Sequence, residues 1–172
     1  MRIAGYVRES ADPSADRPAF AQQEELRRYA VEHGHDLVAI CRDAREPGHA
    51  LGRAGYRSLL GVIASGSVDT VLVPGLETLA DDEIVQEIML WDLRSRRVRV
   101  LSTRPQDEAI LAGGDPGPSR MVIRHVLARV AEYGRMAAAV PVDASPAPVV
   151  PEAAGEPAED AAPETEVVIE LR

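Results

Sequence analysis

Short apolar runs and helix-forming segments alternate four times along the first 136 residues of this 172-residue chain. The apolar runs predict buried β-strands at residues 2–8, 36–41, 70–73 and 98–102. Helical patterns follow them at residues 19–34, at 55–65, from about Asp81 onward and at 119–136. Such alternation predicts an α/β fold, with a mainly parallel sheet of four or five strands and helices on both faces.

Apolar residues recur at helical spacing in two of these segments. The expected stripes are Phe20, Leu26 and Ala30 on the first helix, and Ile84, Ile88 and Trp91 on the third. Gly34 supplies the stop signal of the first helix. Residues 104–118, rich in Gly and Pro, are expected to form a loop before the last helix.

The last helix has a broad apolar stripe. Its members are Ile123, Leu127 and Val130, with Val122 and Val126 alongside. The stripe is wide enough to cover the sheet and still offer a dimer face. Plain core packing and self-association both remain open.

Residues 137–172, called the tail below, differ from the body formed by residues 1–136. They contain ten Ala, six Pro, eight acids and one base, a net charge of −7. The whole chain carries −9, so the body carries −9 − (−7) = −2. A segment of this composition buries too little apolar surface to fold, and we expect it to be disordered. Its Val167-Val168-Ile169 could add a strand to a partner's sheet edge, although a frayed end is the plainer interpretation.

Composition excludes several classes of protein. A single cysteine, Cys41, excludes a disulfide framework and suits the cytoplasm. No signal peptide or membrane-length apolar run is found, so we expect no membrane contact.

No nucleotide-binding glycine motif is present, and we expect no cofactor. His33 and His35 lack a third ligand at metal-site spacing. The arginines at 94, 96, 97 and 99 suit a helix C-terminus as well as a phosphate contact.

Two polar residues follow the ends of predicted strands. Ser10 lies just past the first strand and Glu77 just past the third. If these strands are neighbours, both residues face one crevice, where open α/β sheets bind ligands. A lone serine in a loop is nevertheless more often a turn residue than a nucleophile.

Tyr6, Arg8 and Ser10 together resemble the active-site signature of the serine recombinases, the resolvases and invertases. Other matches are Gln22 in a Gln-x-x-x-Leu segment, Asp43 after the second strand, Arg53 before the second helix, and residues 66–73. The similarity covers residues 1–136, and it implies the resolvase catalytic-domain fold.

The resemblance implies a reaction as well as a fold. Ser10 would attack a DNA phosphodiester and form a phosphoserine link, without a metal. Arg8 and Arg53 would meet the charge of the phosphoryl oxygens, for which arginine's planar fork is suited. Tyr6, Gln22, Asp43 and Glu77 would complete the site. DNA is the implied partner, and helix 119–136 would make a homodimer. Since no DNA-binding module follows that helix, site-specific contact would require a protein partner.

The chain departs from the family at Leu76-Glu77-Thr78-Leu79-Ala80-Asp81-Asp82, where the family pattern is Leu-Asp-Arg-Leu-x-Arg-Asp. Thr78 and Asp81 replace two active-site arginines, a change of three charge units. Each lost contact of this kind costs about 3–4 kcal/mol in the transition state. We therefore expect weak or absent catalysis, unless Arg104 or a partner's arginine reaches the site. The alternatives are a non-catalytic module that dimerises or binds a protein, and an unrelated α/β binding domain.

Overall fold

The computed structural model describes residues 1–9, 17–44, 52–114 and 116–139, with only the backbone of Ala139. Ser10 and nearly all of the tail therefore lie outside the described residues. The elements in chain order are β1 (Arg2–Arg8), α1 (Ala19–Glu32), β2 (Asp36–Asp43), α2 (Ala54–Ala64), β3 (Thr70–Val73), the 3-10 helix η1 (Leu76–Thr78), α3 (Glu83–Ser95), β4 (Arg99–Ser102), the 3-10 helix η2 (Pro105–Asp107), α4 (Glu108–Leu111) and α5 (Pro118–Ala139).

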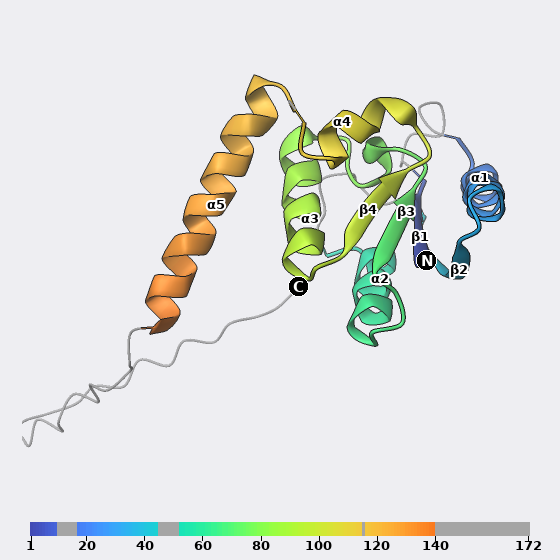
Figure 1. Ribbon diagram of the computed structural model, residues 1–172, viewed down its shortest axis with the longest axis horizontal. Helices are drawn as coiled ribbons and strands as arrows, with labels where there is room; N and C mark the ends of the chain where they lie inside the picture. Colours follow the sequence, from blue (N-terminus) through green and yellow to red (C-terminus); the bar gives the residue numbers. More distant parts are fainter. Residues whose placement is uncertain (10–16, 45–51, 115, 140–172) are drawn as a thin grey trace, which may run out of the picture.

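The four strands form one parallel sheet in the order β2-β1-β3-β4. The expected α/β fold is thus confirmed, with four strands. β1 and β3 are the central pair, so the residues that follow them meet at one edge of the sheet (Figure 1). That edge is where Arg8 and the segment after Val73 come together.

Apolar side chains fill both faces of the sheet, and the two faces are covered by different helices (Figure 1). On one face, Leu26 and Ala30 of α1 pack with Ile3, Val7 and Leu72. On the other face, α2 and α3 pack on the sheet. The buried residues there include Tyr6, Val71, Tyr56, Leu59, Met89, Leu90 and Leu93. Helices on both faces are what parallel strands buried on both sides require.

Some expected helix stripes are wrong. Phe20 is 71% exposed, and the buried face of α1 consists of Ala19, Gln22, Leu26 and Ala30. At 100° per residue, six positions place Phe20 about 120° from Leu26 around the helix, whereas Gln22 lies only about 40° from it. Ile84 and Trp91 are likewise exposed, because α3 turns Met89, Leu90 and Leu93 to the sheet. Part of the expected 104–118 loop is helical, forming η2 and α4.

The long helix α5 packs on α3 and stands away from the sheet (Figure 1). The expectation that its apolar stripe covers the sheet is therefore wrong. Ile123 and Leu127 are half-buried, while the exposed apolar residues are Met121, Val122, Val126, Val130, Tyr133 and Met136. None of the described helices is long and apolar enough to cross a bilayer.

A buried polar cluster fastens α5 to α3. Glu87 of α3, 1% exposed, accepts hydrogen bonds from Arg120 (3.0 Å) and from Arg124 (2.8 and 3.1 Å) of α5. Arg120 also donates to the side-chain oxygen of Gln86. The amide nitrogen of Gln86 in turn donates to the carbonyl of Ala80 at 2.7 Å. One glutamine thus touches both α5 and the loop that contains Asp81.

Candidate active site at the carboxyl ends of β1 and β3

Arg8 ends β1, and its side chain is 1% exposed. Its guanidinium donates to the carbonyls of Glu77 (2.8 Å) and Thr78 (3.2 Å). The turn of η1, closed by a hydrogen bond from the Thr78 amide to the Gly75 carbonyl, presents these two carbonyls. The side chain at the end of β1 therefore meets the turn after β3, whereas Ser10, expected to face the same crevice as Glu77, lies outside the described residues.

Asp81 completes the surroundings of Arg8. Its carboxylate oxygens accept from both terminal nitrogens of the guanidinium, one of them at 3.4 Å. The resemblance described above predicts an arginine at this position. The carboxylate found there lies against the buried Arg8 cation and neutralises it. Thr78, the other position at which the resemblance predicts an arginine, is 5% exposed.

Glu77, after β3, does not contact Arg8 through its side chain. Its carboxylate forms an ion pair with Arg104 at 2.6 Å, with both side chains more than a third exposed. Arg104 thus lies beside the site, but its charge is already paired. Asp107 supports this corner, accepting from the Leu76 amide (3.1 Å) and from the Ser102 hydroxyl (2.6 Å).

Asp43, at the end of β2, anchors the start of α2. Its carboxylate accepts from the amides of Gly55 (2.6 Å) and Tyr56 (3.1 Å) and from the hydroxyl of Tyr6 (2.7 Å). The carboxylate satisfies amides that have no partner within the helix and lies at the positive end of the helix dipole. Burial raises the pKa of the Tyr6 hydroxyl far above its ordinary value, and the bond to Asp43 raises it further. Tyr6 therefore stays protonated and donates.

Arg53, immediately before α2, is the second buried arginine of the site, at 2% exposed. One nitrogen donates to the Leu79 carbonyl and to the Met89 sulfur, and the guanidinium lies 5.9 Å from the Tyr6 ring centre. Its Nε and Nη1 have no hydrogen-bond partner among the described residues. Burying a cation without a carboxylate partner costs free energy, because the charge loses its water. An anionic ligand that pairs with the cation would offset that cost.

Gln22 ties α1 to the end of β1. Its side-chain nitrogen donates to the carbonyls of Arg8 (2.9 Å) and Arg17 (2.7 Å). These bonds hold the two ends of the segment that contains Ser10, which itself lies outside the described residues. The structure thus brings Tyr6, Arg8, Asp43 and Arg53 together as neighbours, with the buried Gln22 on the Arg8 carbonyl and the partly exposed Glu77 beside them.

Sequence reasoning missed three residues of this region. Glu9 accepts from the first amide of α1 at 3.0 Å and from Arg42 at 2.8 Å, and so fixes the helix start. Asp107 and Gln86 brace the segment after β3 from either side. Glu9 directly follows the Tyr-x-Arg pattern, and this position next to Arg8 could have marked it as a residue of the site. The other two lie in a predicted loop and on a helix face, where sequence alone marks no role.

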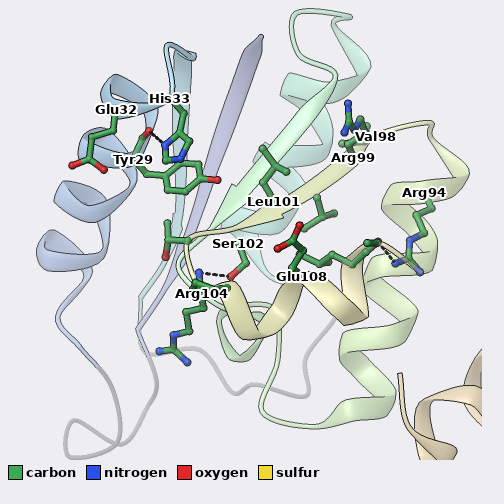
Figure 2. A pocket seen from close by; sticks show the side chains of 15 residues that line it. Tyr29, Glu32, His33, Arg94, Val98, Arg99, Leu101, Ser102, Arg104 and Glu108 are labelled. Carbon is green, nitrogen blue, oxygen red and sulfur yellow. Dashed lines mark hydrogen bonds between the residues drawn. The ribbon is translucent and has the colours of Figure 1, made fainter. Parts of the chain in front are cut away.

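A groove of about 730 Å³ lies along β4, beside this site (Figure 2). Tyr29 of α1 and His33, just after that helix, border it on one side, and α4 and Arg94 of α3 on the other. His33 stacks on Tyr29 with ring centres 3.9 Å apart. Within the described ranges, no group of three or more His, Cys, Asp or Glu is placed to hold a metal ion.

Several solved structures share this fold. The N-terminal catalytic domain of TP901-1 integrase is 21% identical, with 80% of this chain and 98% of that domain covered and a TM-score of 0.55. The C-terminal catalytic domain of ISC1926 TnpA, an IS607-like serine recombinase, is 17% identical, with 76% and 99% covered and a TM-score of 0.52. A resolvase family site-specific recombinase from Streptococcus pneumoniae is 22% identical, with 80% and 90% covered and a TM-score of 0.51. At these identities the likeness shows the fold alone.

No curated protein matches the chain significantly. The sequence profile of the family described as "Resolvase, N terminal domain" matches residues 3–139. That match covers β1 through α5, including every described residue of the site. The chain therefore belongs to the resolvase N-terminal domain family.

Proposed function

We propose that this protein acts on DNA in site-specific recombination, and that its own strand cleavage through Ser10 is weak or absent. Ser10 would attack the phosphodiester, and Arg8 and Arg53 would contact the phosphate. Tyr6, Gln22, Asp43 and Glu77 would position these groups. The observation that carries the proposal is the ion pair between Arg8 and Asp81.

The charge of the site supports weak catalysis. A transferring phosphoryl group requires cations that are placed before the reaction and are free to meet its oxygens. Arg8 already donates to two carbonyls and to the Asp81 carboxylate. Binding of a phosphate would have to displace that carboxylate or place two anions side by side. Thr78 supplies no replacement charge.

Arg53 supports retained phosphate contact. Its guanidinium is buried, lacks a carboxylate partner among the described residues, and has two nitrogens without a partner there. A phosphate oxygen would satisfy such a group. Binding without efficient cleavage is thus the combination that these two arginines favour.

The exposed apolar residues of α5 support self-association. A stripe of Val122, Val126 and Val130 on a helix that stands clear of the sheet is costly to leave in water. Packing this stripe against a second copy would form the homodimer. The body carries a net charge of only −2, unlike the basic domains that typically bind DNA on their own, so a protein partner would supply site-specific contact. We place this activity in the cytoplasm, where the free, buried Cys41 would stay reduced.

Covalent trapping tests the proposal. The full chain is incubated with fragmented genomic DNA of its host and denatured, and DNA attached to the polypeptide is measured. Ser10→Ala is the blank. We expect little adduct from the native chain and a rise of 100-fold or more from Thr78→Arg/Asp81→Arg.

A charge-matched control separates chemistry from simple attraction to DNA. Asp36→Arg/Ser58→Arg adds the same three units of charge on exposed residues away from the site. It should bind DNA more tightly without forming adduct. Abundant adduct from the native chain that vanishes in Ser10→Ala would refute the proposal that strand cleavage is weak or absent. No adduct from any variant, with native folding retained, would favour the alternative of a non-catalytic dimerising module.

A further inference from the structure

Among the described residues, no strand pairs with the outer edge of β4. β4 is the last strand of the described sheet, and β3 is its neighbour there. The amides of Arg99 and Thr103 donate to Asp69 and Val73, both at 3.0 Å, so these residues face β3. Because alternate residues of a strand face opposite neighbours, the backbone groups of Val100 and Ser102 point outward. No strand among the described residues pairs with them.

The groove described above runs along this open edge (Figure 2). Leu101 belongs to the apolar cluster on the α1 side, and Val100 packs against the cluster on the opposite side. Leu111 and Ala112 continue the wall at α4. An added strand would lie about 4.8 Å from β4, between apolar walls on both sides. Exposed edges of this kind accept extended peptides.

Three arginines border the groove. Arg94, Arg99 and Arg104 line it with two acids, Glu32 and Glu108, and Arg104 is already paired with Glu77, so the groove carries no net excess of positive charge. Arg99 is exposed and has no carboxylate partner among the described residues. An extended apolar segment that also carries an acid near Arg99 would therefore suit the groove.

We propose that residues 164–171 of the tail dock in this groove as a fifth strand beside β4. Their sequence is Glu-Thr-Glu-Val-Val-Ile-Glu-Leu, without Pro or Gly. In an extended conformation Val167, Ile169 and Leu171 share one face, and Glu166, Val168 and Glu170 share the other. The apolar face would pack on one wall of the groove, and Val168 on the opposite wall, with a flanking glutamate near Arg99. The rest of the tail, rich in Pro and Ala, serves as the connection.

The tail is long enough to reach the groove. α5 has 22 residues, so its end lies about 33 Å along its axis from the start beside α4. Residues 140–163 span up to about 80 Å when fully extended. Docking within one chain therefore requires no rearrangement of α5.

Amide hydrogen exchange, followed by NMR on the full chain, tests the docking. The amides of Val100 and Ser102 should exchange slowly, because an added strand would accept their hydrogens. Val168→Pro removes a donor from the tail and should speed their exchange at least tenfold. Val150→Pro, the same change elsewhere in the tail, should have no effect. Amides of β2, the other edge strand, serve as the internal reference.

A charge reversal provides an independent check. Glu166→Arg/Glu170→Arg should also speed exchange at Val100 and Ser102, whereas Glu152→Arg/Glu156→Arg should not. Fast exchange at both amides in the native chain would overturn the proposal. Slow exchange that persists in Val168→Pro would also overturn the proposal. So would slow exchange that appears only as protein concentration rises, because a second copy would then cover the edge of β4.

Discussion

Asp81 binds the guanidinium of Arg8 through both carboxylate oxygens, although only the arginine is buried: the side chains are 62% and 1% exposed. The pair joins the end of β1 to the loop after η1. Since Asp81 faces solvent, its carboxylate can be removed without opening the core.

Asp81→Asn should therefore keep the fold and increase anion binding. Without the carboxylate, an anion near Arg8 meets less repulsion, and we expect the Kd for inorganic phosphate to fall about tenfold. Phosphate-dependent thermal unfolding measures this, because a ligand of the native state raises Tm. Asp36→Asn, an exposed acid at the start of β2, is the control. Equal phosphate dependence in both variants would contradict the role assigned to Asp81.

Asp43→Ala should be strongly destabilising. It leaves the Tyr6 hydroxyl and the amides of Gly55 and Tyr56 buried without their shared acceptor. We expect a loss of about 3 kcal/mol in the free energy of unfolding, measured with urea. Asp36→Ala, on the same strand but exposed, should change it by less than about 0.5 kcal/mol. A similar loss in both variants would show that Asp43 does not anchor α2.

Two glycines of α2 should respond to alanine in opposite directions. A Cβ on Gly55 would lie 2.4 Å from the carbonyl oxygen of Arg42, a backbone atom that cannot turn aside. We expect Gly55→Ala to cost about 2–3 kcal/mol of stability. Gly61 has nothing within 4 Å of the same position, and Gly61→Ala should add about 0.5–1 kcal/mol. Urea unfolding of both variants gives the comparison, and a stable Gly55→Ala would refute the close packing of α2 on β2.

The cluster that fastens α5 should make stability depend on pH. Burial alone would raise the pKa of Glu87, but hydrogen bonds from Arg124 and Arg120 outweigh it and hold the pKa below its usual 4.5. A carboxyl whose pKa is lower in the folded state stabilises the protein above its unfolded pKa. That stabilisation is lost as pH falls through the folded pKa. Urea unfolding between pH 7 and pH 3 should show this loss.

Glu87→Gln isolates the contribution of this carboxyl. The variant should be less stable at pH 7, and its stability should fall less steeply below about pH 4.5. Glu132→Gln, which removes an exposed pair with Arg129 on α5, should keep the native pH profile. An unchanged profile in Glu87→Gln would mean that another group carries the acid sensitivity.

Periodicity was sufficient to predict the sheet, since the apolar runs at residues 2–8 and 70–73 became the central strands. Periodicity failed for Phe20. The apolar spacing predicted that Phe20 is buried with Leu26, but the buried face of α1 contains Gln22 instead. The glutamine is buried because its amide reaches two backbone carbonyls, and apolar counting takes no account of such bonds.

The candidate site was likewise predictable from the sequence only in part. The motif marked Tyr6, Arg8, Asp43 and Arg53 as candidate site residues, and their roles stay predictions. The pairing of Asp81 with Arg8 could not be predicted, because it depends on how η1 turns the chain after β3. The sequence shows an acid at position 81, but its partner could be identified only from the coordinates.

Gln86 has consequences beyond packing. Its two side-chain ends engage Arg120 on α5 and the Ala80 carbonyl beside Asp81. An amide group is rigid and planar, so a displacement at one end is transmitted to the other. A ligand or partner that displaces α5 would therefore also bias the loop that carries Asp81, and a displacement of that loop would bias α5 to the same extent. Two hydrogen bonds of one side chain thus connect the outer helix to the carboxylate beside Arg8.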